Sequence, residues 1–192
     1  SKALDLAKSS KEYRNNPVLL KKFYTGLAKT KIRLSKDDEA LNLLNDAIQV
    51  APDDYQMYNL RAGLNIQKLN FQDALGDLNK SIALQGKNPD AFYLRGSVKQ
   101  KMGQFSSAIS DYNQAVLLQP NYVQAIAGRA SCQLSTGKYN EAVRDYQKAL
   151  ELNPQSSELK KQLAEARTKQ YEANVESVKP VLTLLKPQGS NQ

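Results

Sequence analysis

The side chains that most often carry out catalysis or bind metal ions are scarce in this chain of 192 residues. It contains no histidine and a single cysteine, Cys132. The absence of histidine excludes Ser-His-Asp and Cys-His catalysis, histidine metal ligation and a histidine pH switch. A single cysteine excludes an internal disulfide and any zinc or iron–sulfur site that needs several thiolates. We therefore expect no enzyme, no cofactor and no metal site.

Three local features resemble reactive sites but have simpler interpretations. Nothing near Cys132 in the sequence would lower the pKa of its thiol, so we expect a buried structural cysteine. Lys138 follows Gly137, but this run lacks the spacing of a phosphate-binding loop and is better explained as a turn between helices. The acidic run 37–39 precedes a helical pattern, and capping at the positive end of that helix explains it.

The positive charge of the chain is concentrated at one end. Residues 1–36 contain ten Lys or Arg and two Asp or Glu, which gives this segment the whole net charge of +8. A nucleic-acid-binding protein would more often extend its basic surface across the fold, so nucleic acid is an unlikely partner. We interpret the segment as a local basic patch that faces a protein. The alternative is that residues 1–36 bind an anionic surface or nucleic acid.

No apolar run approaches the roughly 20 residues that a membrane-spanning helix needs, so no membrane span is expected. The favoured location is cytoplasmic. Because the sequence begins at Ser1, a periplasmic or other secretory compartment stays open if a leader was removed.

The elements that position these side chains recur every 34 residues. Small, aromatic and large apolar residues form aligned columns: Ala40, Ala74, Ala108 and Ala142; Tyr24, Tyr58, Phe92 and Ile126; Ala28, Ala62, Gly96 and Ala130; Leu44, Leu78, Tyr112 and Tyr146; and Ala47, Ser81, Ala115 and Ala149. Each period holds two helical patterns around a short breaker, and prolines at positions 52, 120 and 154 close three of the units. One such helix pair cannot bury its apolar face alone, so the pairs must stack.

This combination of period, alanine spacing, aromatic columns and closing prolines resembles the tetratricopeptide repeat (TPR) family over residues 21–156. The resemblance implies an all-α fold, a right-handed superhelical solenoid of antiparallel helix pairs with flanking capping helices. The expected organisation is an N-terminal cap or half repeat (1–20), four repeats (21–54, 55–88, 89–122 and 123–156), a C-terminal capping helix (157–177) and a tail (178–192). A lone helix is expected over residues 3–14. The short apolar patch of the tail is expected to pack on the final helix, or to dock into a groove of its own chain or of a neighbour.

A pair of columns predicts a contact between helices. Arg61, Arg95 and Arg129 share one repeat position, and Asp77, Asp111 and Asp145 share another, sixteen residues later. In the first repeat both positions hold leucine, at 27 and 43. Because both members change together within one chain, we expect a structural ion pair rather than a binding site.

The resemblance implies that the first helix of each repeat lines a concave surface, which binds an extended segment or a helix of a partner. Helical spacing then assigns the partner-binding residues: Lys22, Thr25, Lys29 and Arg33 in the first repeat; Asn59, Gly63 and Gln67 in the second; Tyr93, Ser97, Gln100 and Lys101 in the third; and Gln124 and Ser131 in the fourth. The three cations of the first repeat fall on one helical stripe, because their intervals are seven and four residues. This basic end would favour an acidic residue or a C-terminal carboxylate, while amide side chains could pair with a peptide backbone.

One subset of the family binds the acidic C-terminal tails of heat-shock chaperones through a clamp of Lys, Asn, Asn, Lys and Arg. The clamp positions here hold Thr25, Lys29, Leu60, Asp90 and Leu94, or, one repeat later, Asn59, Gly63, Leu94, Gln124 and Gly128. Neither set matches, so an adaptor of that type is not expected. The sequence predicts a non-enzymatic scaffold or adaptor for a protein partner, in a chaperone (as a co-chaperone), secretion or assembly system. It leaves the partner and the oligomeric state open.

Overall fold

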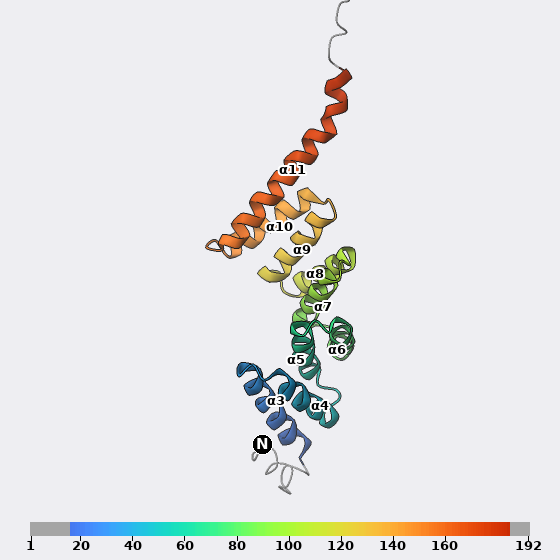
Figure 1. The fold of residues 1–192 in the computed structure, drawn as a ribbon, viewed down its shortest axis with the longest axis vertical. Coiled ribbons are helices and arrows are strands. Elements are labelled where there is room, and N and C mark those ends of the chain that lie inside the picture. Colours follow the sequence, from blue (N-terminus) through green and yellow to red (C-terminus); the bar gives the residue numbers. More distant parts are fainter. Residues whose placement is uncertain (1–15, 185–192) are drawn as a thin grey trace, which may run out of the picture. The chain divides into compact units, whose positions relative to one another are not determined.

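The structure, a computed structural model, describes residues 16–184, with side chains described as far as Lys179. This part of the chain forms helices and no strand (Figure 1). It divides into two compact units, residues 1–102 and 103–192. Unit 1 contains α3 (Pro17–Arg33), α4 (Asp37–Val50), α5 (Tyr55–Gln67), α6 (Phe71–Leu84) and α7 (Pro89–Lys101). Unit 2 contains α8 (Phe105–Leu118), α9 (Val123–Ser135), α10 (Tyr139–Leu152) and α11 (Ser157–Leu184). The predicted all-α series of helix pairs is confirmed, and the helix expected over residues 3–14 lies outside the described residues.

The first helices of the first three repeats begin at side-chain caps. Asn16, Asp54 and Asn88 each accept a hydrogen bond from a backbone N–H in the first turn, at 3.1, 3.0 and 3.3 Å. Such caps satisfy amide groups that have no partner within the helix. Helix α3 therefore begins at Pro17, four residues before the predicted start of the first repeat.

The turn inside each repeat contains one residue in the left-handed region. Gly103 and Gly137 have φ of 74° and 75°, and the equivalent residues Ser35 and Leu69 have φ of 54° and 61°. A left-handed residue ends the first helix and lets the chain reverse into the second. The predicted turn at Gly137 is confirmed. The left-handed conformation of Ser35 and Leu69 could not be predicted from their residue types.

The predicted columns of small residues form the contacts between helices. Ala40, Ala74, Ala108 and Ala142 are completely buried, and so are the residues of the column that begins at Ala47. In unit 1 one apolar cluster joins α3, α4 and α5 and another joins α5, α6 and α7. In unit 2 a cluster joins α9, α10 and α11. Because one face of each first helix is packed in this way, the opposite face is the one exposed to solvent.

Helix α11 is longer than the predicted capping helix. Leu159, Leu163 and Ala166 are buried against the core of unit 2, which confirms the narrow apolar stripe. The helix then continues past residue 177 to Leu184, into the segment predicted as a tail. That segment contains two prolines, yet a proline inside a helix, which removes a hydrogen bond and crowds the preceding turn, does not always end the helix. The docking of the rest of the tail lies outside the described residues.

Candidate functional site

The stripe of cations predicted on the first helix is exposed. Lys22, Lys29 and Arg33 are exposed on α3 and make no ion pair with any of residues 16–184. Two other cations of the same helix are already paired: Lys21 with Asp54 at 2.8 Å, and Lys31 at 2.6 Å with an acid on α4. The structure therefore separates the cations of α3 into a paired set and an unpaired stripe.

The acidic run at the start of α4 accounts for part of this separation. Glu39 pairs with Lys31 at 2.6 Å and with Lys36 at 3.4 Å, and these cations lower the pKa of its carboxyl. Asp38 pairs with Lys68 at 2.8 Å. No side chain caps α4, so the predicted role in capping is incomplete. The run fits the helix dipole and also binds neighbouring lysines.

Two adjoining hollows lie beside the stripe in unit 1. The first, of about 360 Å³, is lined by Lys22, Thr25, Lys29 and Gln56, among others. The second, of about 260 Å³, is lined by Lys29, Gln56 and Asn59, together with residues at the start of α7. Because the two hollows share Lys29 and Gln56, we describe them together as the α3–α5 groove. Its lining combines an exposed ammonium group with amide side chains that can donate or accept hydrogen bonds.

Two amide side chains at the second hollow have unsatisfied buried atoms. Asn59 Oδ1 and Asn88 Nδ2 have no hydrogen-bond partner within the described residues. The other side of the Asn88 amide is occupied, since its Oδ1 accepts from Ala91 N at 3.3 Å. Buried polar groups are normally paired, so these two atoms are exceptions, as are Ser81 Oγ and Gln133 Oε1 elsewhere in the described residues. Thr25 is fixed instead, because its hydroxyl donates to Lys21 O at 2.7 Å.

The other predicted site residues do not line the α3–α5 groove. Arg33 lies at the end of α3, Gly63 and Gln67 lie further along α5, and on α7 Tyr93, Ser97 and Gln100 are half-buried while Lys101 is exposed. Burial raises the pKa of Tyr93.

In unit 2 the predicted residues have different surroundings. Gln124 lines a hollow of about 610 Å³ together with Gln162 of α11. Ser131 makes a side-chain hydrogen bond with Tyr146, so its hydroxyl contributes to packing within that unit.

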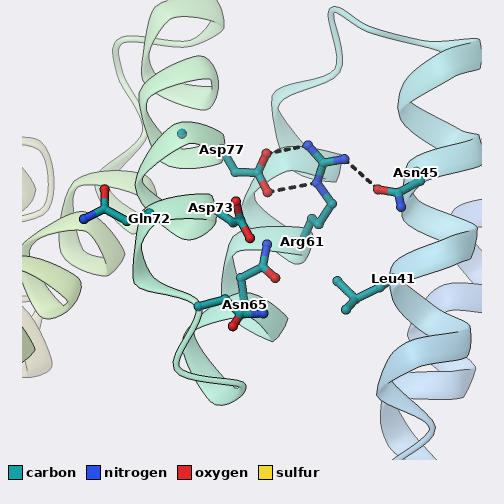
Figure 2. A pocket seen from close by; sticks show the side chains of 9 residues that line it. Leu41, Asn45, Arg61, Asn65, Gln72, Asp73 and Asp77 are labelled. Carbon is teal, nitrogen blue, oxygen red and sulfur yellow. Dashed lines mark hydrogen bonds and ion pairs between the residues drawn. The ribbon is translucent and has the colours of Figure 1, made fainter.

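Two of the three predicted ion pairs are confirmed, one in each unit. Arg61 binds Asp77 through two hydrogen bonds of 2.6 and 2.9 Å, and Arg129 binds Asp145 through two of 2.7 Å. Figure 2 shows Arg61 of α5 between Asp77 of α6 and Asn45 of α4, whose Oδ1 accepts at 2.6 Å. The Asp77 carboxylate raises the pKa of Arg61. The two-point contact with aspartate fixes the guanidinium plane and joins the two helices of one repeat, while the contact with asparagine joins them to the second helix of the preceding repeat.

Sequence analysis missed the asparagine of this network. Asn79 accepts from Arg95 at 2.8 Å and Asn113 accepts from Arg129 at 2.8 Å, as Asn45 does from its arginine. The three asparagines are spaced by 34 residues, so a column search at this position would have found them.

The structure also shows the surroundings of Cys132 and of the other side chains that could react or bind a metal ion. Cys132 is completely buried, as predicted, and burial raises its thiol pKa to about 11. Among the described residues, no cluster of His, Cys, Asp or Glu could hold a metal ion. Within the same residues, no helix has the length and apolar character to cross a membrane.

Stacked helix pairs, with small residues at their contacts and a polar groove beside the first helices, define the class of helical repeat scaffolds. Family models described as "Tetratricopeptide repeat" match residues 25–91, 89–122 and 123–156, which together span residues 25 to 156 without a gap. The chain belongs to the tetratricopeptide repeat family. Its fold is that of a protein–protein interaction scaffold. The comparison with curated proteins gave no match.

Several solved structures are similar to this chain. A crystal structure of MamA is 26% identical, covers 75% of this chain and 82% of its own, and has a TM-score of 0.67. YrrB, described as "a TPR protein with an unusual peptide-binding site", is 21% identical, with coverage of 83% and 81% and a TM-score of 0.68. The first TPR of Spaghetti (RPAP3), bound to the HSP90 peptide SRMEEVD, is 24% identical, with coverage of 59% and 90% and a TM-score of 0.58. The last two likenesses concern the fold alone.

Proposed function

We propose that this protein is an adaptor whose α3–α5 groove binds an extended, acidic segment of a partner protein. The observation that carries the proposal is the stripe of Lys22, Lys29 and Arg33, exposed and without an ion pair among residues 16–184 while Lys21 and Lys31 are paired. Unpaired cations beside a groove attract carboxylates and raise the rate of association with an acidic partner.

The groove also supplies groups that recognise a peptide backbone. Gln56 and Asn59 line it next to Lys29, and each amide can donate and accept. The two solved relatives described with a peptide or a peptide-binding site support a peptide as the ligand class. The proposed ligand is therefore held by its main chain, with one or more acidic side chains facing the stripe.

The proposed segment is internal rather than a free C-terminus. Asp90 lines the second hollow together with Lys29, and it stands where the chaperone-tail clamp requires a lysine. A carboxylate at that point repels a second carboxylate, so the acidic side chains of the proposed segment face Lys22 and Lys29 at the first hollow. A role as an adaptor in a chaperone, secretion or assembly system is compatible with such binding, without the recognition of chaperone tails.

A charge-reversal experiment tests this function. The triple variant Lys22→Glu, Lys29→Glu, Arg33→Glu is compared with wild type for binding to peptides selected by the wild-type chain from a library of random extended sequences. We expect the selected peptides to be acidic and the triple variant to bind them at least about tenfold more weakly, a change of about 1.4 kcal/mol. Circular dichroism should report unchanged helicity.

A second triple variant serves as the matched control. Lys80→Glu, Lys148→Glu, Lys160→Glu changes the net charge equally, on exposed positions of α6, α10 and α11. If both variants lost binding equally, the loss would be an effect of net charge, and this would contradict a local binding site. Selection of anionic polymers over peptides, with a steep dependence on salt, would favour the alternative function instead.

A further inference from the structure

Unit 1 contains another hollow, separate from the two hollows of the α3–α5 groove and built mainly from the second helices of the repeats. It has a volume of about 560 Å³ and lies between α4, α5 and α6, around the Arg61–Asp77 pair (Figure 2). None of its lining residues lines the α3–α5 groove. We call it the α4–α6 pocket, and nothing in the proposed function uses it.

A buried amide without a partner faces this pocket. Asn65 of α5 is 7% exposed, and its side chain makes no hydrogen bond with any residue in the described range. In Figure 2 it lies below Arg61 and Asp73, on the side toward Leu41 of α4. Unlike the Asn59 and Asn88 atoms, its polar atoms are not closed off from the surface. A buried amide normally finds a partner within the fold, so this one is available to a ligand.

A glycine keeps the pocket open. Gly76 lines it from the middle of α6, and a Cβ atom built there would meet nothing within 4 Å. Packing therefore does not require glycine at this position, although glycine weakens a helix. Two repeats later the equivalent position holds Arg144, so the helix accepts a long side chain there. The absence of a side chain at Gly76 leaves room for a group from outside.

The charges of the lining select a cation. Arg61 directs its guanidinium to Asp77 and Asn45, so the arginine and Asp77 are committed to each other. Asp73 is exposed and forms no close ion pair among the described residues, although its charge adds to the effect of Asp77 in raising the pKa of Arg61. An anion would meet two carboxylates, and no aromatic ring lines the pocket to stack on a sugar or a base. A positively charged donor of several hydrogen bonds fits an exposed carboxylate beside the amide of Asn65.

We propose that the α4–α6 pocket takes an arginine side chain from a partner protein. Asp73 is its counter-ion, and the amide oxygen of Asn65 accepts a hydrogen bond from one of its remaining N–H groups. Arginine suits the site better than lysine, because its planar group offers five donors in fixed directions and its stem can pack on Leu41. The adaptor then has two separate contacts, an acidic segment in the groove and a basic side chain in the pocket.

The test uses N-acetyl-arginine methylamide as the probe, with the citrulline analogue as its neutral isostere. Titration of the full ¹⁵N-labelled chain should shift backbone signals around residues 70–77, with a Kd of about 1 mM. The citrulline analogue should bind at least about tenfold more weakly. Asp73→Asn and Gly76→Arg should abolish binding, and the latter should do so by filling the pocket.

Two further variants separate binding from folding. Glu141→Gln is the matched control, since residue 141 is the equivalent of Asp73 two repeats later, and it should leave the titration unchanged. Asn65→Leu should remove binding without lowering Tm, because it removes an amide that has no partner. Equal shifts with the citrulline analogue, binding that survives Asp73→Asn, or no shifts around residues 70–77 at about 10 mM probe would each overturn the proposal. The groove triple variant should still bind the probe, so each proposal can fail alone.

Discussion

At the scale of single residues, Gly128 shows how tightly unit 2 is packed. A Cβ atom on Gly128 would lie 2.6 Å from Cζ of the Tyr112 ring. We predict that Gly128→Ala lowers the free energy of unfolding by about 1–3 kcal/mol, because the buried ring must move. Gly63 is the comparison, since a Cβ there meets nothing within 4 Å. Gly63→Ala should raise stability by about 0.5–1 kcal/mol, and urea unfolding of both variants checks the opposite signs.

The ion pair of unit 2 gives a second prediction. Arg129→Leu should cost about 2–4 kcal/mol, because it leaves the Asp145 carboxylate mostly buried and unpaired. The double variant Arg129→Leu, Asp145→Leu should recover most of that loss. The first repeat already has this arrangement, with Leu27 packed against the cluster that contains Leu43. A double variant as unstable as the single one would contradict the explanation by an uncompensated charge.

The sequence predicts the residues of repeated columns better than those of the groove. Arginine and aspartate change together between repeats, so their contact could be inferred from one chain. The unpaired state of Lys22 and Lys29 could not, because it depends on which acids of α4 and the following loop reach Lys21 and Lys31. Helical spacing places a cation on a face, whereas ion pairing depends on the neighbouring helices.

At the scale of elements, the turn inside each repeat differs between the two halves of the chain. Leu69 is 68% exposed and adopts φ of 61°, where the later repeats have glycine. Because a left-handed conformation costs a residue with a Cβ about 1–2 kcal/mol, we predict that Leu69→Gly raises stability by about 1 kcal/mol. Gly137→Leu should lower it by about as much, and thermal unfolding measures both. Destabilisation by Leu69→Gly would contradict the assignment of strain to this turn.

A helix end could be predicted where a capping residue stands next to a proline. Asn88 followed by Pro89 marks the start of α7, and the structure has the cap there. The end of α11 could not be predicted, because no buried apolar side chain marks its outer turns as far as the described side chains extend. After Ala166 the described side chains of α11 are half-buried or exposed, with Tyr171 at 70%. The length of such a helix depends on the intrinsic helix propensities of its residues, and these are too small to fix where the helix ends.

At the scale of the whole molecule, two buried titratable side chains of unit 2 make the stability depend on pH. Burial raises the pKa of the Cys132 thiol to about 11 from an ordinary value of 9.0, and that of the Tyr146 hydroxyl to about 12 from 10.0. Both groups stay neutral in the folded unit at a pH where the unfolded chain would ionise them. Their contribution to stability is therefore complete below about pH 9 and is lost as the pH rises through 11 and 12.

The loss of stability at high pH gives a prediction for unit 2. The loss of stability between about pH 9 and 11 should be smaller in Cys132→Ala than in wild type, because the variant lacks the thiol. Urea unfolding at several pH values measures this difference.

At neutral pH a thiol reagent should modify Cys132 only as fast as unit 2 opens. Rapid modification of the folded chain would contradict the burial of this residue.

The most direct test of the groove as a protein-binding site is a capture experiment from the source lysate. Wild type, the Lys22/Lys29/Arg33 reversal and the Lys80/Lys148/Lys160 reversal are used as baits, each with and without nuclease. We predict a protein that is retained by wild type and the control, lost from the groove variant and unaffected by nuclease. Capture that disappears with nuclease, or that survives reversal of the stripe, would contradict recognition of a protein segment by the α3–α5 groove.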